Sequence, residues 1–73
     1  MRYKDNKTGM IIIEWKTMPA QKVFGVLSMP NWDMLVGVGE NGELAVICWA
    51  EDEPEKLKQQ IEKVVEENYT IIE

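Results

Sequence analysis

The chain has 73 residues and a formal net charge of −5, and 45% of its residues are hydrophobic. The negative charge argues against a nucleic-acid backbone or an anionic membrane as its partner. Because the chain contains no histidine and one cysteine, Cys48, an internal disulfide, a Cys/His zinc site and imidazole catalysis are excluded. We expect a single small domain over residues 1–73 that binds no metal or cofactor and is stabilised by its core and by oligomerisation.

The N-terminal residues lack an apolar core of the length that a signal peptide needs. No segment approaches the roughly 20 apolar residues of a membrane span. A lone, unpaired cysteine is typical of reducing compartments. We therefore expect a cytoplasmic protein that does not associate with membranes.

The first main strand is expected at residues 10–16, which read M-I-I-I-E-W-K. The run of β-branched residues favours a strand, and Glu14 and Lys16 place polar side chains on one of its faces. Upstream, the segment D-N-K-T-G at 5–9 is a good turn sequence. It predicts that residues 2–4 form a short edge strand that folds back on the first.

Two Met-Pro segments, at residues 17–24 and 28–35, resemble each other at a spacing of eleven positions. A proline presets its own φ for a turn and pushes the preceding residue into an extended conformation. Both segments therefore predict short links between strands of a meander, whose strands recur every 8–12 residues or so. The next two strands are expected at 22–28 and 33–39.

A β-hairpin is predicted where Asn41-Gly42 links the third strand to a fourth at residues 43–50. A two-residue loop sets Met34 opposite Trp49. A three-residue loop with Gly42 in the left-handed conformation shifts the register by one residue. Because the fourth strand is almost wholly apolar, both faces of the hairpin are apolar in either register.

Acidic residues and a proline mark the start of a helix near position 53. Asp52 and Glu55 have the spacing of a capping box, and Pro54 suits a first helical turn. The helix is expected over residues 53–68. Its single apolar stripe consists of Leu57, Ile61, Val64 and Val65. The residues that follow, 69–73, predict a short final strand that docks on an edge of the sheet.

These elements together predict an α+β fold in which one C-terminal helix packs on one face of an antiparallel β-meander. The four main strands are expected at residues 10–16, 22–28, 33–39 and 43–50, with the helix at 53–68 and the short terminal strand at 69–73.

One helix covers only one face of such a sheet. We expect the second face to pack against a second copy of the chain or another protein; the alternative is a sheet that bends at its glycines and encloses that face itself. The candidate interface residues are Met18, Phe24, Val26, Met29, Trp32, Leu35, Gly37 and Gly39. Trp32 in particular either packs over the end of the sheet or projects as a binding anchor.

No motif in the chain points to catalysis: it lacks a glycine-rich phosphate loop and a nucleophile–base pair. Cys48 lies in an apolar strand near acidic residues, which indicates a core position and not a reactive thiol. The acidic residues at 51–55 are interpreted as the solvated start of the helix, because a proline stands where a calcium loop needs glycine.

The expected function is a small cytoplasmic protein–protein interaction module, a homodimer that acts as an accessory or regulatory factor and is not an enzyme. Two alternatives stay open. One is an acidic inhibitor that mimics nucleic acid, and the other is a small-molecule binder that uses a curled sheet as a cup with Trp15, Trp32 or Trp49 at its mouth.

Overall fold

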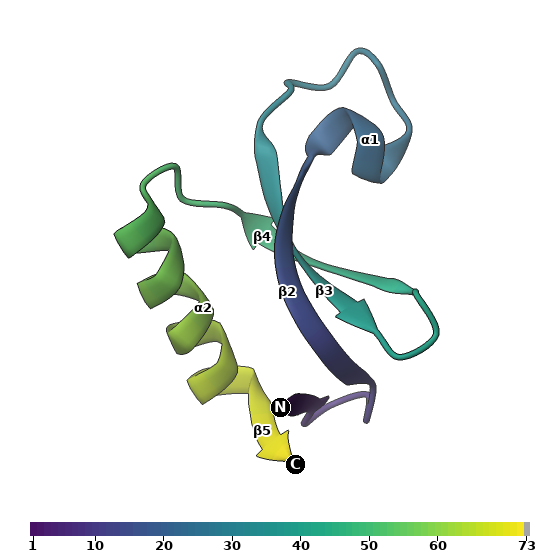
Figure 1. Ribbon diagram of the computed structural model, residues 1–73. Coiled ribbons are helices and arrows are strands. Elements are labelled where there is room, and N and C mark those ends of the chain that lie inside the picture. The colour runs from purple at the N-terminus through teal and green to yellow at the C-terminus, as the bar shows by residue number, and fades with distance from the viewer. Residues whose placement is uncertain (73) are drawn as a thin grey trace.

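The computed structural model describes residues 1–72 and has an α+β fold, with a five-stranded antiparallel sheet and one long C-terminal helix (Figure 1). The predicted fold class is thereby confirmed. The elements in chain order are β1 (Arg2–Asp5), β2 (Ile11–Pro19), α1 (Ala20–Phe24), β3 (Asp33–Gly39), β4 (Leu44–Trp49), α2 (Pro54–Asn68) and β5 (Tyr69–Ile72). The last residue of the predicted terminal strand, Glu73, lies outside the described residues.

The strand order across the sheet is β4-β3-β2-β1-β5. The predicted N-terminal strand exists, but it is not at the edge. β5 pairs with it antiparallel, with Tyr3 opposite Ile71 and Lys4 opposite Thr70. The C-terminal strand therefore docks on the sheet as expected, and β4 and β5 are the two edge strands.

The predicted strand at residues 22–28 is wrong, because Ala20–Phe24 form the short helix α1 and the chain then turns. Gly25 ends α1 with a φ of 68°, a left-handed conformation that glycine adopts without a Cβ clash. The Gln21 side-chain amide donates to two carbonyls of the following loop, at 2.9 and 3.1 Å. β2 correspondingly continues to Pro19 before α1 begins.

Each face of the sheet carries its own hydrophobic cluster. On the side of α2, the buried members are Ile12, Val65 and Tyr69. On the opposite side, α1 covers a cluster made by Ala20, Met34 and Val36. The second face is therefore covered in part by the chain's own short helix.

The β3–β4 hairpin contains both predicted registers, separated by a β-bulge. Near the turn, Gly42 has a φ of 85° and Val38 lies opposite Leu44, as the three-residue loop requires. Farther along, the pairing shifts by one residue, and Met34 lies opposite Trp49. The extra residue at Ile47 decides which face each later side chain of β4 occupies.

α2 begins and ends close to the predicted bounds, but the capping box is absent. Glu53 is the N-cap, no side chain caps the first turn, and the Leu57 amide donates to the Glu53 carbonyl at 2.8 Å. Asp52 therefore lies outside the helix, in the link from β4.

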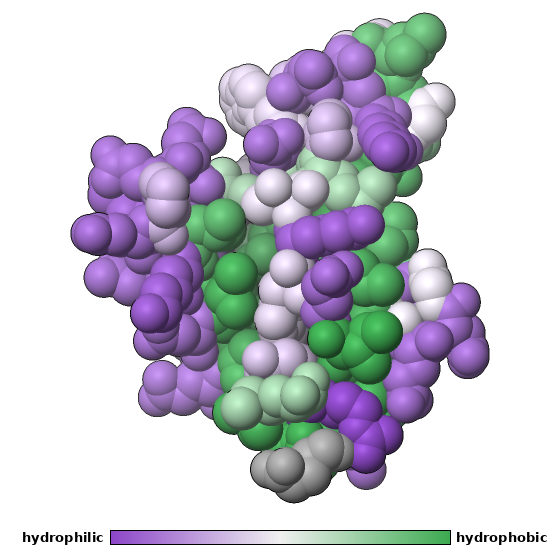
Figure 2. Space-filling model, in the orientation of Figure 1, coloured by the Kyte–Doolittle hydropathy of each residue, from purple (hydrophilic) through white to green (hydrophobic). Residues whose placement is uncertain are grey.

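The surface of the molecule is divided by polarity. The outer side of α2 is almost uniformly hydrophilic, whereas hydrophobic atoms reach the surface beside α2 and on the other side of β2 (Figure 2). Ten large hydrophobic side chains in the described part of the chain are at least 40% exposed. Across residues 1–72, no helix is long and apolar enough to cross a membrane.

Candidate functional site

Three of the predicted interface residues are buried inside the chain. Leu35 is 0% exposed, and Gly37 and Gly39 are also buried. A Cβ placed on Gly37 would lie 3.0–3.1 Å from side-chain atoms of Trp15 and Ile12, which belong to the cluster beneath α2. By strand alternation, these three residues lie on the covered face. The expectation that these three residues are open to a partner is therefore corrected, because α2 and the side chains of Trp15 and Ile12 already cover this face.

The other predicted interface residues are divided between the core and the surface. Met18 packs against the cluster beneath α1, and Met29 is half-buried. Phe24 and Val26 are 46% and 44% exposed, at the end of α1 and in the loop that follows. Trp32, at the end of that loop, is 63% exposed.

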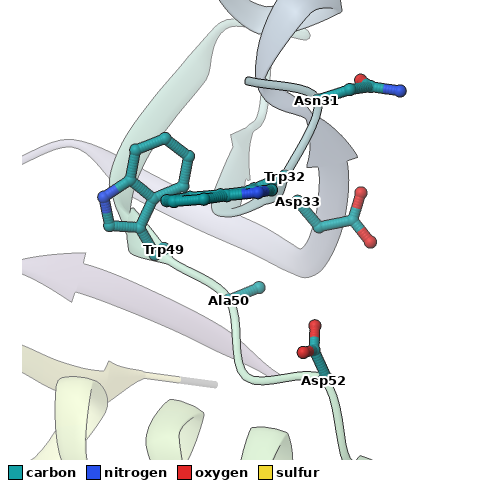
Figure 3. A pocket seen from close by; sticks show the side chains of 6 residues that line it. All are labelled: Asn31, Trp32, Asp33, Trp49, Ala50 and Asp52. Carbon is teal, nitrogen blue, oxygen red and sulfur yellow. The ribbon is translucent and has the colours of Figure 1, made fainter. Parts of the chain in front are cut away.

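Trp32 meets Trp49, which the sequence analysis placed in a core strand. The two ring centroids are 5.1 Å apart with an interplanar angle of 71°, an edge-to-face arrangement. Trp49 nevertheless stays 44% exposed. The pair lies beside a hollow of about 340 Å³, the Trp32–Trp49 groove (Figure 3). The lining residues are Asn31, Trp32, Asp33, Trp49, Ala50 and Asp52.

Hydrogen bonds to residues of α1, β3 and α2 hold the backbone that carries the two rings. The Trp32 carbonyl accepts from the Ala20 amide at 2.7 Å, and the Ala50 amide donates to the Asp33 carbonyl at 2.9 Å. From α2, the Gln60 side chain donates to the Trp49 carbonyl at 2.7 Å and accepts from the Glu51 amide at 3.0 Å. The exposed rings therefore project from a rigid base formed by α1, β3 and α2.

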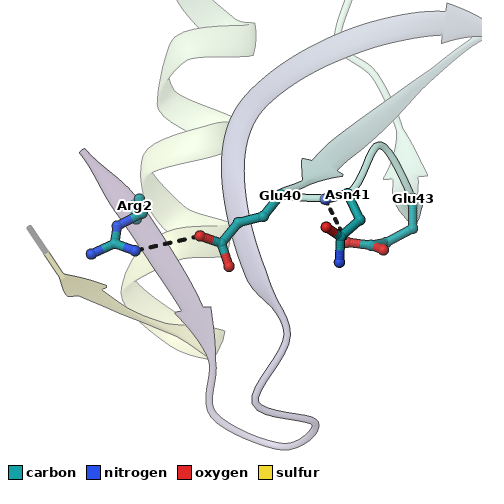
Figure 4. A network of polar contacts seen from close by, with 4 residues as sticks. All are labelled: Arg2, Glu40, Asn41 and Glu43. Carbon is teal, nitrogen blue, oxygen red and sulfur yellow. Dashed lines mark hydrogen bonds and ion pairs between the residues drawn. The ribbon is translucent and has the colours of Figure 1, made fainter.

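The groove carries negative charge without a local counter-charge. Asp33 and Asp52 line it, and no lysine or arginine is among its lining residues. Within residues 1–72, neither of these aspartates forms a salt bridge. At the far end of the hairpin, by contrast, Glu40 is paired with Arg2 at 3.4 Å (Figure 4).

Cys48 has the environment of a structural residue. Its sulfur accepts from the Gln60 side-chain amide at 3.2 Å. Burial raises the pKa of the Cys48 thiol, and the negative charge of Glu51 raises that pKa further, so the thiol stays protonated near neutral pH. Among the residues that the structure describes, no cluster of acidic or cysteine side chains is arranged to hold a metal ion.

Sequence reasoning named Trp49 only as one of three tryptophans at the mouth of a cup, interpreted Asp52 as part of the solvated start of the helix, and did not single out Asp33. Trp49 turns away from α2 only because the bulge at Ile47 shifts the register, and no residue type marks that bulge. Asp33 and Asp52 come together because the end of β3 is bonded to Ala50, just before the link to α2. Comparison with protein-family models, with curated proteins and with solved structures finds no match to this chain.

Proposed function

We propose that this chain is a protein–protein interaction module, a homodimeric accessory or regulatory factor that self-associates through the uncovered half of its second sheet face. That half, the turn-end strip, consists of Val38, Leu44 and Val46. Leu44 and Val46 are 43% and 40% exposed, whereas Met34 and Val36 on the same face lie beneath α1. The exposed apolar strip beside a covered one is the observation that carries the proposal.

The flanking charges favour a second copy as the occupant of the strip. Glu14 pairs with Val38 and Lys16 pairs with Val36, so both charged side chains lie on this face of the sheet. In a twofold dimer, a residue of one copy meets a different residue of the other, and the same contact occurs twice. Glu14 of one copy can therefore lie against Lys16 of the other copy, and Lys16 of the first against Glu14 of the second.

Sedimentation velocity over a dilution series tests this proposal. The wild-type chain is expected to form a dimer that dissociates on dilution. Val46→Lys is expected to yield a monomer, because it places a desolvated charge in the strip of each copy. Lys16→Glu is expected to weaken the dimer through repulsion with the acidic neighbour, and the double variant Glu14→Lys/Lys16→Glu is expected to restore it.

Ile71→Lys serves as the matched control, because this side chain is 52% exposed on β5, at the opposite edge of the sheet. It is expected to leave the dimer unchanged. A wild-type chain that sediments as a monomer at every concentration would overturn the proposal. A dimer that is insensitive to Val46→Lys would show that a different surface is used.

A further inference from the structure

We infer that the Trp32–Trp49 groove binds an arginine or lysine side chain presented by a basic segment of a partner protein. This inference concerns the end of β4 opposite the turn-end strip and does not depend on self-association. Val46, the member of the turn-end strip nearest to the groove, is three positions from Trp49 on the strand, which corresponds to roughly 10 Å at about 3.3 Å per residue. The two surfaces can therefore be tested separately.

The aromatic rings provide the first part of the recognition. The face of an indole ring attracts a cation, and tryptophan is the strongest of the aromatic residues in this respect. Trp32 is 63% exposed, and Figure 3 shows its ring beside Trp49, with the Asp33 side chain extending from the backbone on the other side. Because Trp49 supports that ring edge-to-face at 5.1 Å, a ligand meets a ring that is already oriented.

The carboxylates provide the second part and select the sign of the ligand charge. Asp33 and Asp52 line the groove without a salt bridge among the described residues. An apolar ligand would desolvate these carboxylates with no compensation, and an anion would be repelled. A guanidinium group can stack its flat face on an indole ring while its N–H groups, which lie in the plane of the guanidinium, donate to carboxylates. Arginine is therefore expected to bind more tightly than lysine.

The surroundings favour a basic protein segment over an isolated small cation. The groove opens directly onto the link between β4 and α2, where Glu51, Asp52 and Glu53 follow one another. Among the described residues of this link, only Glu53 forms a salt bridge, with Lys56 at 3.9 Å, and Glu51 lines a separate hollow on α2 together with Lys56 and Lys63. Further basic residues of a bound segment would lie along this acidic link.

A fluorescence titration with defined peptides tests the inference. The probes are a short Arg/Gly/Ser peptide, its lysine counterpart and its glutamine counterpart, added to the full chain at low and at physiological ionic strength. The arginine peptide is expected to bind most tightly and the glutamine peptide not at all. Binding is expected to weaken with salt, because exposed charges are screened within about 10 Å at 0.1 M.

Variants separate recognition by the groove from general attraction to an acidic protein. Trp32→Ala is expected to weaken binding of the arginine peptide about fivefold or more, whereas Trp32→Phe retains most of it. Asp33→Asn/Asp52→Asn is expected to weaken it about five- to tenfold at low salt. The control Glu62→Gln/Glu66→Gln removes the same net charge from α2. It is expected to change the affinity less than twofold, because salt screens exposed charges that are distant from the groove.

Circular dichroism of each variant confirms that it is folded before it is titrated. The inference is overturned if the glutamine peptide binds as well as the arginine peptide, if Trp32→Ala binds like the wild type, or if the α2 control loses as much affinity as the groove variant. Sedimentation of the same samples measures independently whether the chain still forms a dimer through the turn-end strip. A negative titration with an intact dimer therefore rejects this inference alone.

Discussion

Leu35→Ala is expected to lower the free energy of unfolding by about 2–5 kcal/mol, the usual cost of emptying a buried leucine site. Leu35 is 0% exposed in the middle of β3, between β2 and β4 in the sheet. Leu44→Ala removes the same atoms from a side chain that is 43% exposed on the neighbouring strand. It is expected to cost about 1 kcal/mol or less, since little apolar area returns to water.

Urea unfolding followed by circular dichroism measures both changes, at a protein concentration low enough for the chain to be monomeric. A typical domain has a stability of only about 5–15 kcal/mol, so the loss at Leu35 should move the midpoint clearly. The sequence-based interface predicts a different result, in which Leu35→Ala weakens dimerisation and leaves the monomer's stability unchanged. Equal losses at Leu35 and Leu44 would contradict the buried position of Leu35.

The elements that sequence analysis located correctly carry strong local signals. Asn41-Gly42 requires a tight turn, and Gly42 indeed has a positive φ of 85°. The amphipathic stripe and Pro54 place α2 within a residue of its observed bounds. Such signals act over a few neighbouring residues, so they can be read without knowledge of the tertiary structure.

The segment at Ala20–Phe24 shows where local reading failed. Its V-F-G-V-L continuation resembles a strand because of its apolar and β-branched residues. Gly25 instead serves as the left-handed stop of a short helix. The helix forms because burial of Ala20 against Met34 and Val36 outweighs the weak strand propensity of the segment.

The sequence does not determine which face of the sheet α2 covers, and the reason is physical. Residues 34–38 are apolar or glycine on both sides of β3, so alternation does not indicate which side receives α2. The decision depends on long-range packing of Trp15 and Ile12 over Gly37. The same limit applies to the groove: Trp32 and Trp49 were each named as candidate binding residues, but the contact between their rings was not predicted.

Gly37→Ala is expected to lower the free energy of unfolding by about 1–3 kcal/mol, because it overpacks the core beneath α2. The added Cβ would lie 3.0 Å from the ring of Trp15 and 3.1 Å from Ile12. Neither neighbour can move easily: Ile12 is 0% exposed, and Trp15 packs edge-to-face between Tyr3 at 5.5 Å and Tyr69 at 5.1 Å.

Gly39→Ala, two positions along the same strand, separates this packing effect from the general effect of replacing glycine. Its Cβ would meet the end of the Glu43 side chain, which is exposed and can rotate away. Neither glycine has a positive φ, so alanine fits both backbones and loses less entropy on folding. Urea unfolding of the two variants is expected to show a loss at Gly37 and little change at Gly39. If Gly37→Ala were neutral, Trp15 would not be packed on this strand, and the face that carries Leu35 would again be open to a partner.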